Sequence, residues 1–300
     1  METAFALPGA WYRGNLHGHT TESDGTLTPE AYVAAYRRLG YDFVAATDHW
    51  RVTDLAAYAA PDLAWVPGVE VDGRDAAGSV YHVLALGVQE VPPRAAAADL
   101  PGLVRAVREL GGLPFAAHPY WSGQTGAELA AVPGLAGLEV FNGTCEVRWG
   151  KGVARVQWDE ALAAGARLLG LATDDAHHRV EVGDDLGLGW VWVRARENHA
   201  PALLEALASG AFYASTGPAL YDFEVAPRGP GDRPVARVRC SPCRAVRFLC
   251  ERALGGTVRA PEGRLLTEAE FPLHPAARLV RVECVDARGR VAWSQPLWTG

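Results

Sequence analysis

The stretch that decides this chain covers residues 15–25 and reads Asn15-Leu16-His17-Gly18-His19-Thr20-Thr21-Glu22-Ser23-Asp24-Gly25. On a strand, the imidazoles of His17 and His19 point to the same side, because side chains alternate between the two faces. Asp24 follows five residues after His19, in a Ser-Asp-Gly turn. Two imidazoles and a carboxylate at a strand end suit a divalent metal at the mouth of a barrel. One H-x-H pair occurs by chance in many short strands, so this assignment needs further ligands elsewhere in the chain.

Candidate metal ligands recur where other strand-like segments end. They are His49 in Thr47-Asp48-His49, Glu70 in Gly68-Val69-Glu70, His118 in His118-Pro119, and Asp175 and His177 in Thr173-Asp174-Asp175-Ala176-His177-His178. His82 opens or lies within another such segment. A capping or helix-dipole role explains one histidine, but not a series spread over five separated strand ends. A closed barrel would bring these ends together, so the series indicates a metal centre.

Residues 12 to about 220 alternate between strand-like and helix-like segments, which is the pattern of a parallel α/β fold. The candidate strands are Arg13–His17, Asp42–Thr47, Ala64–Val69, Tyr81–Leu86, Leu113–Ala117, Leu138–Phe141, Leu168–Ala172 and Trp190–Val193. The candidate helices are Pro29–Leu39, Asp99–Leu110, Val153–Ala164 and Ala200–Ser209. Thr28 is a suitable N-cap for the first helix, and Gly40 is suited to end it.

From Leu220 onward, apolar and polar residues alternate between Pro/Gly turns, which indicates a small antiparallel sheet. Its candidate strands are Val235–Cys240, Ala245–Glu251, Leu279–Val285 and Arg290–Trp293. We therefore expect two domains, an α/β domain at 1–220 and a small β domain at 221–300. Cys240 and Cys243 form a C-x2-C pair, but a zinc ribbon needs a second pair, which the sequence does not supply.

Composition excludes several classes of protein. The apolar fraction is 49%, as in ordinary globular proteins, and no run of about eighteen apolar residues predicts a membrane span. Residues 1–11 lack the features of a secretory signal, so we expect a cytoplasmic protein with reduced thiols. The net charge of −7 disfavours a broad surface for nucleic acid or anionic membranes. We expect a small-molecule substrate, and the sequence does not indicate an oligomeric state.

In this order, the motifs H-x-H, S-D-G, T-D-H, G-V-E, H-P and D-x-H resemble those of the PHP family, the metal-dependent phosphoesterases named for polymerase and histidinol phosphatase. The resemblance covers about residues 13–218. It implies a distorted (β/α)7 TIM-like barrel, so the expected fold class is α/β, with this barrel followed by a small C-terminal β-rich domain. It also implies two or three divalent metal ions as cofactors.

The resemblance further implies how the ligands divide among the metals. One metal would be held by His17, His19, Glu70 and Asp175. Glu70 would bridge to a second metal, held by His82 and His118, and a third would be held by Asp24, His49 and His177. Such a mixture of imidazoles and carboxylates suits Zn, Mn or Fe, and the sequence does not choose among them.

Neighbouring residues allow more than one interpretation. Asp48 is expected to orient a ligand rather than bind metal, and only Asp175, not Asp174, gives the D-x-H spacing. In the segment 141–151, taken as a loop, Arg148 and Lys151 could neutralise a phosphate. The alternative is an ordinary solvated loop.

Aromatic residues near this segment also allow two interpretations. Tyr120, Trp121 and Trp149 could form the wall of an aromatic pocket, or they could simply pack in the core.

These observations predict a metal-dependent hydrolase, foremost a phosphoesterase acting on a small phosphate ester or nucleotide through a metal-bridging hydroxide. Glu70 would fix the metal spacing. His177 or His178 could protonate the leaving group, or a metal could take its charge. The segments 212–218 and 294–298 resemble the carbaryl-hydrolase-like branch of PHP proteins, which implies carboxylic ester or carbamate hydrolysis instead. The remaining alternative is a metal-binding module without turnover.

Overall fold

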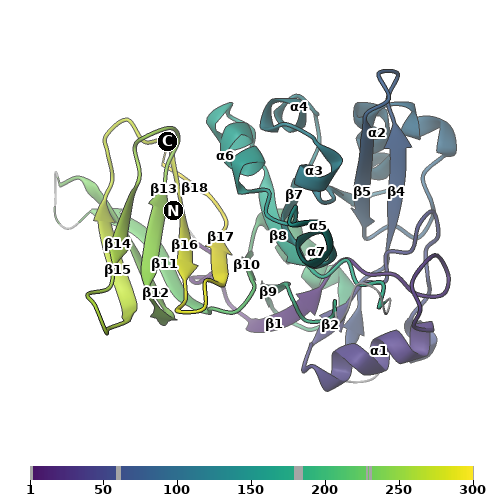
Figure 1. The fold of residues 1–300 in the computed structure, drawn as a ribbon, viewed down its shortest axis with the longest axis horizontal. Helices are drawn as coiled ribbons and strands as arrows, with labels where there is room; N and C mark the ends of the chain where they lie inside the picture. The colour runs from purple at the N-terminus through teal and green to yellow at the C-terminus, as the bar shows by residue number, and fades with distance from the viewer. Residues whose placement is uncertain (1–2, 59–61, 179–184, 228, 230–231, 300) are drawn as a thin grey trace.

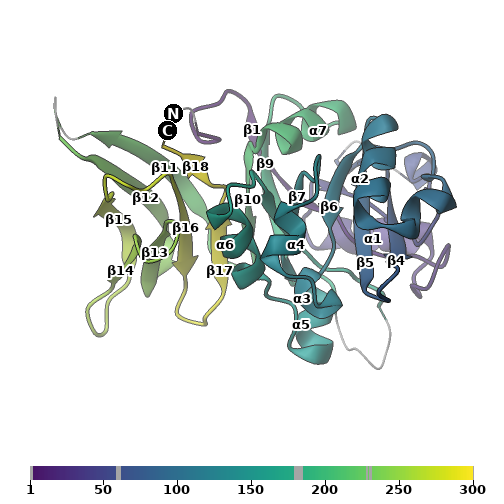
Figure 2. The ribbon, with the colours of Figure 1, turned by 90° about the horizontal axis from the view of Figure 1, so that it is seen from above.

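The structure is a computed structural model that describes residues 3–58, 62–178, 185–227, 229 and 232–299. Figures 1 and 2 show that the C-terminal strands, coloured green to yellow, gather at one end of the molecule. The helices and the earlier strands form the rest. Within the described ranges, no helix is both long and apolar enough to cross a membrane.

The strands of the described chain form three sheets. The largest runs in the order β14 (Gly256–Arg259), β13 (Ala245–Leu249), β16 (Leu279–Val285), β17 (Val291–Ser294), β10 (Phe212–Ser215), β9 (Trp190–Ala195), β1 (Ala10–Asn15), β2 (Phe43–Val44) and β3 (Ala64–Trp65), with β18 (Leu297–Trp298) paired to β16. The second contains β4 (Gly68–Arg74), β5 (Val80–Leu86), β6 (Leu113–Ala116), β7 (Gly137–Asn142) and β8 (Leu169–Thr173). The third contains β11 (Leu220–Pro227), β12 (Pro234–Cys243) and β15 (Leu266–Pro272).

The α-helices are α1 (Pro29–Arg38), α2 (Leu100–Glu109), α3 (Pro119–Ser122), α4 (Gly126–Ala130), α5 (Gly143–Trp149), α6 (Arg155–Ala163) and α7 (Ala200–Ser209), and two short 3-10 helices are η1 (Ala56–Tyr58) and η2 (Arg94–Ala98). The expected caps of α1 are confirmed. The Thr28 side chain accepts a hydrogen bond from the Ala31 backbone N–H at 3.2 Å, and Gly40 adopts φ 73° after the last turn. These caps satisfy backbone groups that a helix end otherwise leaves unpaired.

The interpretation of residues 141–151 as a loop is wrong, because most of this segment forms α5. The side chain of Asn142 caps the helix by accepting from the backbone N–H of Cys145 at 2.9 Å. Cys145 is buried, whereas Trp149 at the end of the helix is exposed. The cap and the buried side chains of Thr144 and Cys145 hold this short helix against β7.

The expected parallel fold is only partly present, and the closed (β/α)7 barrel is not confirmed. The pairs β1–β2, β2–β3, β6–β7 and β7–β8 are parallel, but β4–β5, β5–β6, β1–β9 and β9–β10 are antiparallel. Residues 75–79 join β4 directly to β5, and so short a connection permits only antiparallel pairing. Single bridges, Gly18–Ala176 and His49–Glu70, link strand ends of the two larger sheets.

The C-terminal strands continue the sheet of the α/β part. Strand β10 pairs with β9 on one side and with β17 on the other. The division into domains at residue 220 stays a prediction, since the largest sheet runs through both sides of that position. The predicted antiparallel strands are present as β12, β13, β16 and β17.

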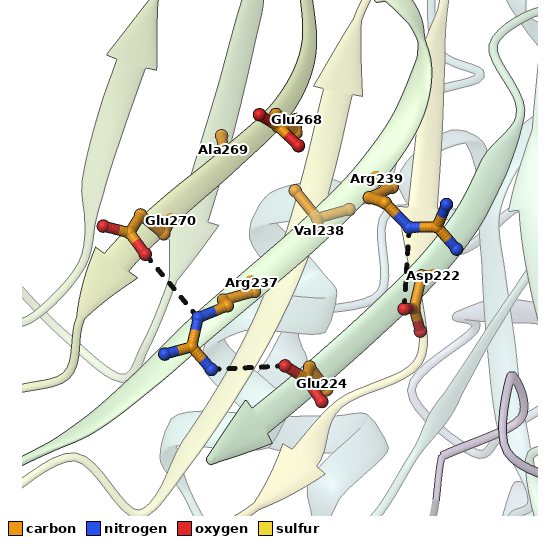
Figure 3. A pocket seen from close by; sticks show the side chains of 8 residues that line it. All are labelled: Asp222, Glu224, Arg237, Val238, Arg239, Glu268, Ala269 and Glu270. Carbon is orange, nitrogen blue, oxygen red and sulfur yellow. Dashed lines mark hydrogen bonds and ion pairs between the residues drawn. The ribbon is translucent and has the colours of Figure 1, made fainter. Parts of the chain in front are cut away.

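The outer face of the three-stranded sheet is covered by charged side chains that pair with one another (Figure 3). Arg237 lies 3.2 Å from Glu224 and 3.6 Å from Glu270, and Arg239 lies 3.7 Å from Asp222. Exposed pairs of this kind add little stability. They do keep one face of an antiparallel sheet in water while the other face packs on the core.

Buried charges join the C-terminal strands to α6. Arg281 on β16 is fully buried, and its guanidinium donates to Asp159 at 2.5 Å and to Glu283 at 3.0 Å. Glu283 also accepts from Arg247 at 2.9 Å and from Arg155 at 3.4 Å. Burial would raise the pKa of Glu283, but Arg281 and the other guanidinium groups outweigh burial and lower this pKa. The cluster is therefore charged as well as buried.

We predict that Arg281→Met lowers the free energy of unfolding by about 3 kcal/mol, because it removes a positive charge from the buried carboxylate of Glu283. Urea denaturation measures the change. The exposed Arg259→Met on β14 is the matched control, and it should change the free energy by less than about 0.5 kcal/mol. Equal effects of the two substitutions would contradict a structural role for the cluster.

Candidate metal centre

The structure brings the nine predicted metal ligands together. His17 and His19 follow β1, Asp24 lies in the next turn, His49 follows β2, Glu70 lies on β4, His82 lies on β5, His118 follows β6, and Asp175 and His177 follow β8. Every one of them lies within 4 Å of another member of the set. The sequence order of the motifs thus predicted a spatial cluster, while metal binding by these residues stays a prediction.

Four donor atoms converge on one point. The Nε2 atoms of His17 and His19 each lie 3.1 Å from Glu70 Oε2 and 3.1 Å from Asp175 Oδ1. The two Nε2 atoms are 3.3 Å apart, and the four residues are buried. Five of the six distances among these atoms are thus 3.1–3.3 Å, and the sixth, between the two carboxylate oxygens, is within 4.8 Å. Donors with such spacing can surround one ion at the ~2.0–2.1 Å of Zn–N and Zn–O bonds. The donor set therefore fits a divalent ion.

Glu70 presents its two carboxylate oxygens to two different groups. Oε2 faces the four-atom group, while Oε1 lies 2.8 Å from His82 Nδ1 and 3.1 Å from His118 Nε2. Burial would raise the pKa of Glu70, but the imidazoles of His17 and His82 outweigh burial and hold this pKa well below its ordinary value. Glu70 is thus an ionised carboxylate in the position of a bridge.

The atoms of the third predicted group lie farther apart than those of the first, and Asp24 is more exposed to solvent. Asp24 Oδ1 lies 3.4 Å from His177 Nε2, 3.7 Å from His19 Nδ1 and 3.9 Å from His49 Nε2. The side chain of Asp24 is 41% exposed. His49 Nδ1 is buried without a hydrogen bond and lies 3.5 Å from Glu70 Oε2. A buried nitrogen without a hydrogen bond requires an explanation, and a predicted metal site beside it is one.

Sequence reasoning missed Glu139, a fully buried carboxylate on β7. It lies 2.7 Å from His17 Nδ1 and accepts from the His118 backbone N–H at 2.7 Å, from Asn142 at 2.8 Å and from Thr173 at 2.5 Å. A carboxylate behind an imidazole fixes the tautomer and orientation of the ring, so that the other nitrogen faces the metal. The signal in the sequence was a glutamate inside an apolar strand.

Asp48 and Asp174 hold the loops that carry the ligands. Asp48 accepts hydrogen bonds of 2.6–2.8 Å from Thr20, Ser23 and Thr53, and so fixes the chain between His19 and Asp24. Asp174 faces away from the cluster and accepts from Tyr36 and from the backbone N–H groups of residues 187, 188 and 189. The side chain that reaches the cluster is that of Asp175.

Residues with a strained backbone conformation also lie among the predicted ligands. Among the described residues, five that are not glycine have positive φ: Trp50, His118, Asp175, His178 and Arg252. All but Arg252 are predicted ligands or next to one in sequence. Such conformations cost of order 1–3 kcal/mol each and persist where the surrounding structure imposes them, often at functional sites.

A cavity of about 180 Å³ opens onto the cluster. The residues lining it are Asp24, His49, Glu70, His82, His118, Trp121, Thr144, Cys145, Arg148, Trp149, Asp175 and His177. The structure thus places Arg148 beside the predicted ligands. It does not bring Lys151 or His178 to the cavity wall: Lys151 is exposed, 6.0 Å from the ring centroid of Tyr120, and His178 is exposed.

The C-x2-C pair has a third neighbour that the sequence did not indicate. Cys240, Cys243 and Cys284 are buried, with their sulfur atoms within 4.8 Å of one another. Within the described part of the chain this group contains no fourth ligand, and structural zinc sites almost always have four. We therefore assign these three thiols to the apolar core of the C-terminal strands.

Comparison with solved structures finds proteins of similar fold. A two-domain protein from Bacteroides vulgatus ATCC 8482, containing a predicted PHP-like metal-dependent phosphoesterase, aligns over 97% of this chain and 97% of its own, with a TM-score of 0.52 and 15% identity. A candidate metal-dependent phosphoesterase from Bifidobacterium adolescentis ATCC 15703 covers 55% of this chain and 87% of its own, with a TM-score of 0.40 and 19% identity. An amidohydrolase from Chromobacterium violaceum, with bound sulfate and no metal, aligns over 66% of this chain and 96% of its own, with a TM-score of 0.43 and 16% identity. No family model and no curated protein matches the chain.

The Bacteroides protein and this chain share a fold over nearly the whole length of both. At 15% identity the likeness concerns the fold alone. The comparisons give no support to the carbaryl-hydrolase-like branch that residues 212–218 and 294–298 resemble.

We predict that divalent metal binding releases protons and weakens as the pH falls. Burial would lower the pKa of His19, but Asp175 and Glu70 outweigh burial and raise it to about 9. This imidazole therefore carries a proton at neutral pH without a cation, and a metal must displace it. Between about pH 6 and pH 8, Mn²⁺ affinity should rise by up to about tenfold per pH unit for each proton displaced. Calorimetric titration in buffers of different ionisation enthalpy counts the protons, and a pH-independent affinity would contradict the prediction.

We predict that Glu139→Gln lowers metal affinity about 10–100-fold without removing a ligand. In Glu139 one carboxylate oxygen faces His17 Nδ1 and the other accepts from the His118 backbone N–H. A glutamine has only one acceptor oxygen, so it cannot accept hydrogen bonds at both positions. Titration with Mn²⁺ measures the affinity, and thermal unfolding checks that the variant is folded. The matched control is Glu160→Gln on α6, where a carboxylate accepts from the Gly126 backbone N–H at 3.1 Å. An affinity loss as large in the control would contradict the assigned role of Glu139.

Proposed function

We propose that this protein is a metal-dependent hydrolase of the PHP family that cleaves small phosphate esters. The observation that carries this proposal is the convergence of His17, His19, Glu70 and Asp175, whose two Nε2 atoms lie 3.3 Å from each other and 3.1 Å from each carboxylate oxygen. The second oxygen of Glu70 faces His82 and His118, which supports a second metal position beside the first. The proposal includes the closed (β/α)7 barrel that the resemblance to this family implies.

The residues present would hold two ions through these two groups, and a third through Asp24, His49 and His177. Bound divalent ions supply a Lewis acid for phosphoryl oxygens and lower the pKa of water to near neutrality. The imidazole and carboxylate donors suit Zn, Mn or Fe. Glu70 would act in catalysis by fixing the spacing of the two positions.

A hydrogen bond determines that Nδ1 of His177 carries a proton. Its Nδ1 lies 2.8 Å from the Asp175 carbonyl oxygen, which can only accept, so Nδ1 carries the proton. Its Nε2 faces Asp24 Oδ1, 3.4 Å away. Nε2 is therefore the atom that would meet a metal or, in this proposal, deliver a proton to the leaving group. His178 remains a proposed proton donor only if its exposed ring turns toward the cavity.

Arg148 is the residue that would contact the phosphate in this proposal. Its side chain lines the cavity that the predicted ligands share, and a guanidinium can donate two parallel hydrogen bonds to phosphate oxygens. Lys151 would act only at longer range, as a charge beyond the rim.

Carboxylic ester or carbamate hydrolysis is the alternative substrate class for the same centre. It rests on the resemblance of residues 212–218 and 294–298, and these residues do not line the cavity. In the first segment, Ser215 donates to the Pro218 carbonyl at 2.6 Å and accepts from the Gly217 N–H at 2.9 Å. The segment thus has a local structural role. A metal-binding module without turnover is the other alternative.

Elemental analysis of the purified protein, followed by a screen of aryl phosphates, nucleotides and aryl carbamates, tests the proposal. Phosphate release that depends on Mn²⁺ or Zn²⁺ is the expected result. Carbamate-selective cleavage would instead support the alternative substrate class, carboxylic esters or carbamates. Bound metal without hydrolysis of any of these esters would indicate a module without turnover.

We predict that Glu70→Ala lowers kcat/KM by about 10²–10³ and the metal content together, because one side chain serves two metal positions. His118→Ala should reduce both as well, through the second position alone. Glu109→Gln, an exposed carboxylate on α2, is the control and should change neither. Full turnover by metal-depleted Glu70→Ala protein would show that the proposed mechanism is wrong.

A further inference from the structure

One wall of the cavity is aromatic and continues outward from the predicted second metal position. The ring of Trp121, on α3, lies edge-on 5.0 Å from the His118 ring and 5.8 Å from the His82 ring, measured between centroids. Trp149, at the end of α5, lies 5.5 Å from Trp121 with an interplanar angle of 47°. The two indoles thus form a continuous surface that starts at the imidazoles and ends at the rim of the cavity.

Trp149 is more exposed than packing in the core requires. Its side chain is 45% exposed although it lines the cavity. Helix α5 is already fixed by the Asn142 cap and by buried Cys145, so it does not need an indole at its last turn. An exposed tryptophan at the rim of a polar cavity offers apolar area that a ligand can cover.

The size of the cavity limits what can lie inside it. Its volume of about 180 Å³ is comparable to the ~150 Å³ of a cavity that accepts benzene. The floor is formed by the imidazoles and carboxylates, which suit a phosphoryl group. Little room then remains inside for a substituent on that group, and the tryptophan wall is the part of the lining that leads to the rim.

We propose that Trp121 and Trp149 form a subsite for a flat aromatic group attached at or near the phosphoryl group of the substrate. This inference rests on the proposed function, since the phosphoryl group defines the other end of the ligand. Flat rings stack on indoles in offset or edge-to-face arrangements. The guanidinium of Arg148 lies 4.6 Å from the Trp149 ring centroid, so a cation and an aromatic face stand at the same rim.

The test compares phenylphosphonate with methylphosphonate, which share the phosphoryl end and resist hydrolysis. Binding to the metal-loaded protein is measured by calorimetry and by tryptophan fluorescence. Phenylphosphonate should bind about five- to tenfold more tightly than methylphosphonate, the range expected for an aromatic pair. Trp149→Ala should bring this ratio close to one, and Trp149→Phe should retain most of it.

Tyr221→Ala is the matched control, because Tyr221 is 57% exposed on β11 and does not line the cavity. It should leave the ratio unchanged. Trp121 is a poorer site for substitution, since its ring contacts two predicted ligands; metal content is measured for every variant. Equal binding of the two phosphonates, or a preference that survives Trp149→Ala, would overturn the subsite alone. Binding of neither phosphonate would overturn the proposed function, and the subsite with it.

Discussion

The carboxylates of Glu70 and Asp175 impose the constraint on which the rest of the site depends. Both are buried, and each presents one oxygen to the same pair of imidazole nitrogens. These two carboxylate oxygens lie within 4.8 Å of each other. Two negative charges so close and away from water repel strongly unless positive charge lies beside them. Protons on His17 and His19 can supply that charge, and a divalent ion can supply it in their place. The local chemistry therefore selects for a cation.

The surrounding polar groups hold these donors in place. Glu139 lies behind the ring of His17, and Asp48 ties together the turn that carries Asp24. The Asp174 carboxylate accepts hydrogen bonds from the backbone N–H groups of residues 187–189, and the side chain of Asp175 faces the cluster. Each of these carboxylates is satisfied by hydrogen bonds, as burial requires. The donor geometry is thus fixed by a network that does not itself need a metal.

The sequence predicted what short-range rules determine. The caps of α1 could be read from motifs, because turn chemistry is local. The grouping of the nine candidate ligands is not local, and it was expected from the resemblance to the PHP family. Glu139 could not be read from a motif, since its partner His17 is 122 residues away and the strand around it is apolar. The antiparallel pairing of β9 with β1 and β10 is equally non-local. The helix α5 was missed because its stabilising cap, Asn142, also favours turns.

The C-terminal strands support the strands that deliver the site. Gln295 is nearly buried and makes two hydrogen bonds of 2.9 Å with the backbone of Gly170 on β8, the strand that ends before Asp175. Trp293 on β17 stacks on Phe141 of β7 at 6.2 Å, next to Asn142. Asn142 in turn donates to Glu139 and to Asp175. Packing of the C-terminal strands therefore reaches the predicted ligands through two contiguous routes, which explains how a region without ligands of its own can contribute to the site.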